Sequence, residues 1–418
     1  MCQDQVTLSR RIADLGLVDG GGMPVEVVFF NVGQGDCTLL WFYDRAAPGI
    51  GTHAILVDCG TAGAVPPWRP AAVVTGDAKQ RVIAHLRGRL DHYLSRLRDP
   101  YTLDWLVVTH PDQDHFNLLQ DVLVDGRDPA RLKYTIRNVA YSLRPADYRE
   151  GGGDFMARLF TEWTTFTGVS GQRVVNEPQL VTMPPDPVPL LGTGPGADLH
   201  LVGGVVGPTI HSRGAQQRPG DVKKFAAGEK ERIANMCSLV TVLTGEPDAF
   251  GKRQKVLLMA DAESINEQYL MGLAGPMCSR ESHLWLKLGH HGSKHSTSDE
   301  WLAHTTPDGL FISTGLNAFG GGVATCDAEN LAGRVLVQWE RIRTAHGIPV
   351  PTVRAGLSWG FGFQDNTDAP PWPFVYAPTT EGVFSSLALE PDTAGWRGVD
   401  WHLRLDHAAP GSYDIWYE

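Results

Sequence analysis

Four potential metal ligands follow directly on one predicted buried strand. Residues 104–108 (Asp-Trp-Leu-Val-Val) combine two β-branched valines with a Trp-Leu pair, a pattern that favours a short strand. Pro111 cannot donate to a strand ladder, so the chain must turn out of the sheet there. The next positions hold two imidazoles and two carboxylates: His110, Asp112, Asp114 and His115. Neighbouring side chains on a tight loop cannot all point at one ion, so this loop predicts two adjacent divalent metal ions.

Other predicted strands also end in carboxylates or imidazoles. The strands over 255–259, 284–289 and 54–57 are followed by Asp261, by His290 and His291, and by Asp58. Adjacent histidines on an extended backbone point in different directions, so we expect His290 and His291 to have different partners. Asp58 has a second interpretation as a turn or helix-cap residue.

This mixture of ligand types indicates a hydrolytic metal site. Sets of His and carboxylate suit Zn²⁺, Mn²⁺ or iron, whereas Mg²⁺ and Ca²⁺ prefer oxygen ligands alone. None of the six cysteines falls in the set, so a closed structural zinc site is not expected. A carboxylate such as Asp261 can bridge two ions roughly 3.5–4 Å apart, an arrangement that activates water for hydrolysis. No Ser-His-Asp order, Gly-rich phosphate loop or dinucleotide-binding motif competes with it.

Composition predicts a cytoplasmic protein without a membrane association. The 418-residue chain has the 42% hydrophobic and 20% charged residues of a soluble globular protein. No apolar run approaches the roughly 20 residues that cross a bilayer, and the first residues lack the apolar segment of an export signal. Six scattered cysteines without a Cys-x-x-Cys pair indicate reduced thiols.

The formal net charge of −11 argues against a protein that coats nucleic acid. A protein that coats nucleic acid carries a basic excess, which this chain lacks. An enzyme that meets phosphate through metal ions is not excluded, because bound dications reverse the local charge.

The predicted elements divide the chain into a core and less regular parts. Residues 1–24 form a polar, Gly-rich arm, and residues 25–345 hold most of the readable strands and helices. Residues 125–230 are predicted to be an insertion with a small structure of its own. Residues 346–418 are aromatic-rich and are predicted to be a β-rich C-terminal extension. Helical spacing of apolar residues predicts helices over 77–97, 264–271 and 329–346.

Several motifs, taken in order, resemble those of the metallo-β-lactamase superfamily, and within it the metallo-hydrolase domain of the competence protein ComEC. They lie at 30–36 (FNVGQGD), 57–60 (VDCG), 109–115 (THPDQDH), 235 with 238–240 (N and SLV), 259–261 (MAD), 290–294 (HHGSK) and 312–317 (ISTGLN). Together they span about residues 25–345 and leave the insertion and the tail uncovered.

The resemblance implies an α/β fold, the αββα sandwich of that superfamily, with two divalent ions, Zn²⁺ or Mn²⁺, at one edge. By matching position it implies a set of metal ligands: His110, Asp112, Asp114, His115, Asp261 and His291. It implies catalytic roles for Asp114, His290 and Lys294. It implies substrate contacts at Ser293, Asn317, Gln34 and Asp36, and an outer supporting role for Asp58. For this branch the expected substrate is a phosphodiester, often DNA, and protein partners are not indicated.

Three departures from the family pattern affect the expected site. Asp112 stands where the superfamily usually has a second His, which shifts the metal preference towards Mn²⁺ or weakens one ion site. No counterpart is found for the separate mid-chain His of many members. The Gly-His-Pro expected after Asn317 reads Gly-Gly-Gly-Val over 320–323, without a His.

Three functions stay open at this point. The first is a metallo-phosphodiesterase or nuclease, and the second is a metallo-hydrolase of a small ester, lactone or phosphoryl substrate. The third is a degenerate member that binds nucleic acid or protein without turnover. Ligands at four strand ends favour an enzyme, and the competence-type motifs favour a phosphodiester more strongly than the acidic charge favours a small substrate.

Overall fold

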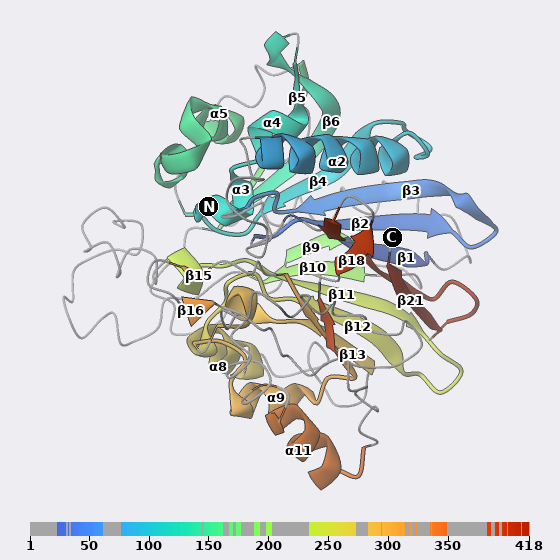
Figure 1. Cartoon of the computed structure of the whole chain (residues 1–418). Coiled ribbons are helices and arrows are strands. Elements are labelled where there is room, and N and C mark those ends of the chain that lie inside the picture. The colour runs from blue at the N-terminus through green and yellow to red at the C-terminus, as the bar shows by residue number, and fades with distance from the viewer. Residues whose placement is uncertain are drawn as a thin grey trace, which may run out of the picture.

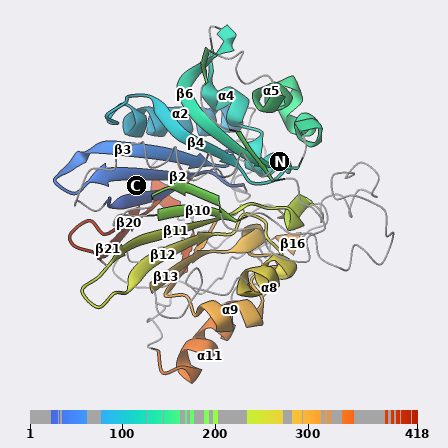
Figure 2. The ribbon, with the colours of Figure 1, turned by 180° about the vertical axis from the view of Figure 1, so that it is seen from behind.

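Two β-sheets lie face to face, and helices cover the outer face of each (Figure 1). The computed structural model describes residues 23–30, 32, 35–61, 77–126, 128–143, 145–161, 167–169, 173–176, 188–192, 198–202, 234–272, 283–293, 295–313, 318–319, 323–324, 335, 337–348, 383–385, 389–392, 395–398, 400–410 and 412–417. Seen from behind, the same layers follow one another, so the order helix, sheet, sheet, helix holds in both views (Figure 2). This mixed α/β arrangement has the layers that were predicted.

The first sheet is built around strands from the N-terminal part of the chain. Its described strands run in the order β21-β20-β1-β2-β3-β4-β6-β5, and β7 and β8 also pair with β6. Their bounds are β1 Val25–Phe29, β2 Thr38–Asp44, β3 Ala47–Val57, β4 Thr102–Val108, β5 Val124–Asp125, β6 Asp128–Ser142, β7 Thr167–Val169, β8 Arg173–Asn176, β20 Trp401–Leu405 and β21 Tyr413–Tyr417. The strands β3, β4 and β6 are parallel.

The second sheet runs in the order β17-β14-β13-β12-β11-β10-β9. Its strands are β9 Val188–Leu191, β10 Asp198–Val202, β11 Val240–Pro247, β12 Arg253–Leu258, β13 His283–Lys287, β14 Gly309–Ile312 and β17 Val383–Ser385. The β11–β12 pair is the predicted antiparallel hairpin, and β12, β13 and β14 are parallel. Two short hairpins, β15 (Ala318–Phe319) with β16 (Val323–Ala324) and β18 (Leu389–Asp392) with β19 (Gly395–Gly398), complete the described strands.

Helices form the two outer layers. The first sheet is covered by α2 (Asp77–Leu94), α4 (Leu119–Leu123) and α5 (Arg149–Thr161), with the short α3 (Gln113–Phe116) and the 3-10 turn η2 (Pro145–Tyr148) nearby (Figure 1). The second sheet is covered by α8 (Ser264–Gly272), α9 (Asp299–Thr305) and α11 (Val337–Ala345). Among the helices of the described ranges, none has the length and apolar character needed to span a bilayer.

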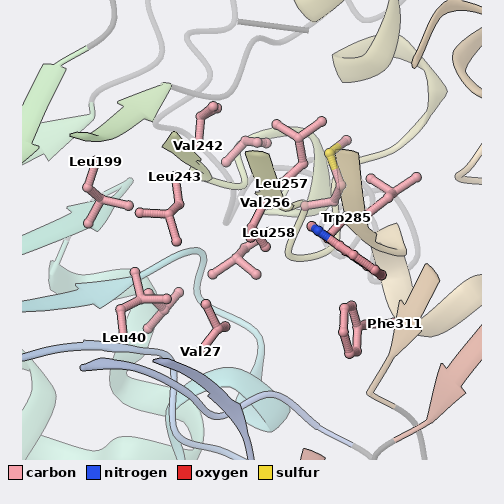
Figure 3. Packing of buried hydrophobic residues seen from close by; sticks show 14 of the residues in the cluster. Val27, Leu40, Leu199, Val242, Leu243, Val256, Leu257, Leu258, Trp285 and Phe311 are labelled. Carbon is pink, nitrogen blue, oxygen red and sulfur yellow. The ribbon is translucent and has the colours of Figure 1, made fainter. Parts of the chain in front are cut away.

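Two apolar layers hold the sandwich together. Between the sheets, Val27 and Leu40 of the first sheet face Leu243 and Leu258 of the second (Figure 3). The alternate strand residue Val28 points the other way and packs in the layer that includes α2. Because both faces of the central strands are covered, these strands read as continuous apolar runs in the sequence. The packing fixes the sheets relative to each other, and therefore the loops at their shared edge.

The segments predicted as an insertion and an extension contribute strands to both sheets. From 125–230, β6 and its neighbours extend the first sheet, while β9 and β10 extend the second. From the C-terminal part, β20 pairs antiparallel with β1, and β17 pairs parallel with β14. The described parts of these segments therefore pair within the sandwich.

Candidate metal centre

The predicted ligand loops converge where strand ends of the two sheets meet. The His110–His115 loop follows β4, Asp58 follows β3, and these two strands are parallel. In the second sheet, Asp261 follows β12 and His291 follows β13, again as parallel neighbours. Carboxyl ends of parallel strands lie at the same edge of a sheet, so two pairs of loops face each other across the sandwich.

Three buried imidazoles share one hydrogen-bonding arrangement. His115 Nδ1 lies 2.8 Å from Asp58 Oδ2, and His291 Nδ1 lies 2.6 Å from the carbonyl oxygen of Ser313. His110 Nδ1 lies 3.1 Å from Thr109 Oγ1, whose own proton goes to Asp58 at 2.7 Å. Each Nδ1 therefore donates to a fixed acceptor, which leaves the lone pair of each Nε2 for another partner.

Those three Nε2 atoms surround the carboxylate of Asp261. Its Oδ1 lies 3.1 Å from Nε2 of His115 and 3.4 Å from Nε2 of His291, and its Oδ2 lies 3.7 Å from Nε2 of His110. Asp114 Oδ2 lies 3.3 Å from Nε2 of His291. One carboxylate is thus shared by three imidazoles from both sheets.

The convergent atoms have no hydrogen-bond partner. Nε2 of His110, His115 and His291 and Oδ1 of Asp261 are buried and unpaired in hydrogen-bonding terms. Buried polar atoms nearly always have a hydrogen-bond partner, so four such atoms without one in the same place need an explanation. Imidazole nitrogens with their far sides fixed, beside carboxylate oxygens, are the donor set that Zn²⁺ or Mn²⁺ takes. These residues therefore fit a metal centre.

Asp112 and His290 lie at the open side of the group. Asp112 Oδ2 is 3.5 Å from Nε2 of His110, and its side chain is 27% exposed. His290 Nε2 is 3.8 Å from Asp261 Oδ2, and its Nδ1 is 3.4 Å from the Asn235 amide. Both adjacent histidines approach Asp261, His290 at Oδ2 and His291 at Oδ1, and they differ in their further partners, Asn235 and Ser313. Their backbone is left-handed and not extended, so the reason given for the prediction was wrong.

The backbone around the site is strained and closely packed. Asp58, Ala260, His290 and His291 all have positive φ, between 46° and 56°. Strained backbone of this kind persists only where the surrounding structure holds it. At Gly60, an added Cβ would lie 2.4 Å from the carbonyl carbon of Asp114, so only glycine permits this approach of the two loops.

The charged groups of the cluster shift one another's pKa values. Burial would raise the pKa of Asp261, but His291 and His115 outweigh it and hold the pKa far below its usual range. Burial would lower the pKa of His291, but the charge of Asp261 and the close approach of Asp114 raise it to about 9. Carboxylates raise the pKa of His115 in the same way, against the effect of burial.

The predicted substrate contacts are placed less completely. Ser293 is 9% exposed, and its backbone N–H donates to the carbonyl oxygen of His290 at 2.7 Å. Gln34, Lys294 and Asn317 lie outside the described residues. Asp36 is 3% exposed as a residue and its carboxylate is paired with Lys287, so the structure places it between the sheets, and its predicted substrate contact stays a prediction.

Three residues at the centre were missed by sequence reasoning. Thr109 fixes the ring of His110 through its hydroxyl, and Ser313 fixes that of His291 through its backbone carbonyl oxygen. Both lie in the motifs at 109–115 and 312–317, but these motifs carry no signal of the two contacts. Lys287 did carry one, since it is a charged residue inside the apolar run Leu-Trp-Leu-Lys-Leu over 284–288. Its ammonium crosses between the sheets to Asp36.

Neither a protein-family model nor a curated protein matches the chain. Among solved structures, the crystal structure of unliganded yeast PDE1 is similar over 78% of this chain and 95% of that chain. The sequence identity is 10% and the TM-score is 0.38. A likeness of that degree assigns neither fold family nor activity, so the resemblance to the ComEC-type domain rests on the sequence motifs.

Proposed function

We propose that this chain is a cytoplasmic metal-dependent phosphodiesterase of the metallo-β-lactamase fold, with DNA as one candidate substrate. The observation that carries the proposal is the set of four buried donor atoms, three Nε2 and one carboxylate oxygen, that converge without hydrogen-bond partners. Leaving such atoms unsatisfied is costly, and a cation satisfies all of them together. The proposed substrate class, a phosphodiester, comes from the resemblance of the sequence motifs to the competence-type branch.

Four overlapping groups of described residues each offer ligand atoms that lie within 4.8 Å of one another. Two of them contain Asp36, with Asp261 and His291 or with Asp58 and His115, and the other two carry the proposal. His110, His115 and Asp261 offer ligand atoms within 4.8 Å of one another, as do Asp114, His115 and His291. Asp261 faces all three imidazoles and would hold divalent ions together with them, and Asp112 would add an oxygen beside His110. Two divalent ions held there would supply Lewis acidity for activating water and polarising a phosphoryl group.

The chain's own side chains supply orientation and contacts with the substrate. Asp58 and Ser313 hold the rings of His115 and His291, so the ligand atoms need no rearrangement. His290 is 23% exposed in its side chain, whereas the rings of His110, His115 and His291 are fully buried. His290 is therefore the imidazole that a substrate reaches first, with Ser293 and Lys294 following it in the chain.

Metal analysis followed by activity assays tests the proposal. We expect the purified protein to contain Zn²⁺ or Mn²⁺ and to cleave at least one phosphodiester among single-stranded DNA, duplex DNA, RNA, cyclic dinucleotides and a chromogenic diester. Asp114→Ala and Asp261→Ala should each lower kcat/KM at least 100-fold, because each removes a buried ligand. Activity is measured with Mn²⁺ and with Zn²⁺ added separately.

Asp44→Ala is the matched control for these variants. Asp44 is at the far end of β2 from the site, 39% exposed in its side chain, and paired only with Arg98 among the ion pairs described. Surface pairs of this kind contribute about 0–1 kcal/mol, so activity should stay unchanged. Turnover that persists in both Asp114→Ala and Asp261→Ala would refute the site.

A further inference from the structure

A buried ion pair joins the two sheets behind the candidate metal centre. Lys287 is the last residue of β13 in the second sheet, and Asp36 precedes β2 of the first. Lys287 Nζ lies 2.5 Å from Asp36 Oδ2, and the two side chains are 2% and 5% exposed. Burying two charges costs desolvation free energy that their attraction does not always repay, so the pair needs a reason beyond holding the sheets together.

Asp36 approaches the Nδ1 atoms of two imidazoles, and one of its carboxylate oxygens lies within 4.8 Å of ligand atoms of Asp261 and His291. Its Oδ2 is 3.8 Å from Nδ1 of His115, and its Oδ1 is 3.9 Å from Nδ1 of His291. Both Nδ1 atoms already have closer acceptors, Asp58 and Ser313, and Oδ1 of Asp36 has no hydrogen-bond partner. Asp36 therefore adds a negative charge behind two ligands without orienting either of them through a hydrogen bond.

The backbone holds Asp36 in this place. Its N–H donates to the carbonyl oxygen of Asp114 at 3.0 Å, and its own carbonyl oxygen accepts from the N–H of Gly60 at 3.0 Å. Ser313 Oγ donates to the neighbouring carbonyl oxygen of Gly35 at 2.5 Å. A carboxylate anchored this firmly stays within the field of the cluster whatever ions are bound.

The balance of charge gives Lys287 a specific part. Among the described residues, the carboxylates around the centre are Asp36, Asp58, Asp112, Asp114 and Asp261. With ligating imidazoles neutral, these five negative charges and the one positive charge of Lys287 leave four negative charges, which two divalent cations cancel. Without Lys287 the centre would carry one uncompensated charge next to two of its ligands.

We propose that Lys287 is a positioning residue that acts as a permanent internal cation: it takes the place of a further metal ion at Asp36 and keeps that carboxylate from ligating. The inference rests on the metal centre of the proposed function. It predicts opposite signs for the two partners. Removing the ammonium makes the centre more attractive to dications, whereas neutralising Asp36 makes it less attractive.

Calorimetric titration of the metal-free full chain with Mn²⁺ tests this charge balance. We expect Lys287→Met to bind Mn²⁺ at least tenfold more tightly than the wild type, and Asp36→Asn at least tenfold more weakly. The double variant Asp36→Asn/Lys287→Met restores the net charge, so its affinity should return to within about threefold of the wild type. Circular dichroism checks that each variant is folded.

Lys255→Met is the matched control for the loss of a buried lysine. Lys255 is 3% exposed on the neighbouring strand β12, six residues before Asp261, which places it roughly 20 Å away along an extended chain. Its replacement should leave the Mn²⁺ affinity unchanged.

The direction in which Mn²⁺ affinity changes in each single variant distinguishes this proposal from an ion pair that only stabilises the fold. A structural pair would weaken Mn²⁺ binding in both single variants, and that result overturns the proposal. If Lys287→Met does not fold, the Mn²⁺ affinities of Asp36→Asn and of the double variant test the proposal instead. Equal Mn²⁺ affinities in these two variants would also overturn it. If the wild-type protein binds no Mn²⁺, the proposed metal centre is wrong, and this inference falls with it. If the wild type binds Mn²⁺ and the variants bind it with the same affinity, only this inference is overturned.

Discussion

The carboxylate of Asp58 lies 2.8 Å from Nδ1 of His115, and this contact determines which ring nitrogen faces the candidate metal centre. An ionised carboxylate only accepts hydrogen bonds, so Nδ1 carries the proton and Nε2 keeps its lone pair. Thr109 holds the carboxylate in turn, through its backbone N–H at 2.8 Å and its hydroxyl at 2.7 Å. Asp58 thereby supports two ligands, His115 directly and His110 through Thr109.

Asp58→Asn should weaken metal binding while preserving the fold. Asparagine tolerates the positive φ of 56° at this position, so the backbone is not strained further. Its amide group can donate to Nδ1 and thus favours the wrong tautomer of His115. Loss of such an outer hydrogen bond typically costs 10- to 100-fold in metal affinity, and we expect that range for Mn²⁺ by calorimetric titration.

Asp104→Asn provides the comparison for this variant. Asp104 also contacts the Nδ1 of a histidine, His53, at 3.2 Å, and lies on β4 within the first sheet. It makes no contact with the metal centre among the interactions described. Its replacement should leave Mn²⁺ affinity unchanged, and an equal loss in both variants would mean that Asp58 acts only through general stability.

Gly60→Ala should destabilise the protein by about 1–3 kcal/mol, the usual cost of forcing extra volume into a packed site. The added Cβ would lie 2.4 Å from the carbonyl carbon of Asp114 and 2.5 Å from the backbone nitrogen of His115, and backbone cannot yield as a flexible side chain can. Urea unfolding measures the effect.

The same substitution in α2 should have the opposite sign. At Gly88 an added Cβ meets nothing within 4 Å, and the residue itself is exposed within α2. Gly88→Ala should therefore stabilise by roughly 0.5–1 kcal/mol. If Gly60→Ala and Gly88→Ala change the free energy of unfolding by the same amount, the close approach of the Gly60 and Asp114 loops is not rigid.

Much of the centre was predictable because it lies in short motifs at strand ends. The ligand loop from His110 to His115, and Asp261 and His291, come together because strands read from their apolar residues bring their carboxyl ends to one edge. Local patterns therefore located the atoms that converge. The helix predicted over 77–97 is α2, which ends at Leu94, because the three last residues leave the helix to form a turn and a bridge to Gly51.

What could not be predicted depends on contacts between distant parts of the chain. The Lys287–Asp36 pair joins residues 251 positions apart, and no local pattern indicates which buried carboxylate a strand lysine will meet. The pairing of β20 with β1 brings the C-terminal part beside the first strand, although an aromatic-rich tail was expected as a separate extension. In both cases tertiary packing selects the partner.

The C-terminal strand β20 is attached to β1 through a buried glutamate, Glu26. Tyr93 donates to its Oε1 at 2.5 Å, His402 Nδ1 contacts the same oxygen at 3.0 Å, and Arg404 donates to Oε2 at 2.9 Å. Burial would raise the pKa of Glu26, but the hydrogen bonds from His402 and Tyr93 and the charge of Arg404 outweigh it and lower the pKa to about 2.

The lowered pKa of Glu26 makes stability depend on acid pH. A carboxylate with a folded pKa of about 2, against 4.5 for the ordinary group, stabilises the fold fully above pH 4.5. That contribution, about 3 kcal/mol, is lost as the pH falls through 2. The difference in unfolding free energy between wild type and Glu26→Gln, measured in urea, should be largest near neutral pH and shrink towards pH 2. A difference that stays constant over this range would mean that Glu26 is not ionised in the folded protein.

Removing divalent ions should lower the thermal stability of the wild type. Asp36, Asp114 and Asp261 lie buried near one another, and the charge of Asp261 acts to raise the pKa of both Asp36 and Asp114, so these carboxylates repel when no cation is present. A ligand at 100 times its Kd stabilises the folded state by about 2.7 kcal/mol, so chelation should lower the unfolding midpoint by several degrees in calorimetry. Re-addition of Mn²⁺ should restore it. Asp261→Asn removes the shared carboxylate, so its midpoint should respond much less to chelator, and a wild-type midpoint that ignores both chelator and Mn²⁺ would show that no cation stabilises this cluster.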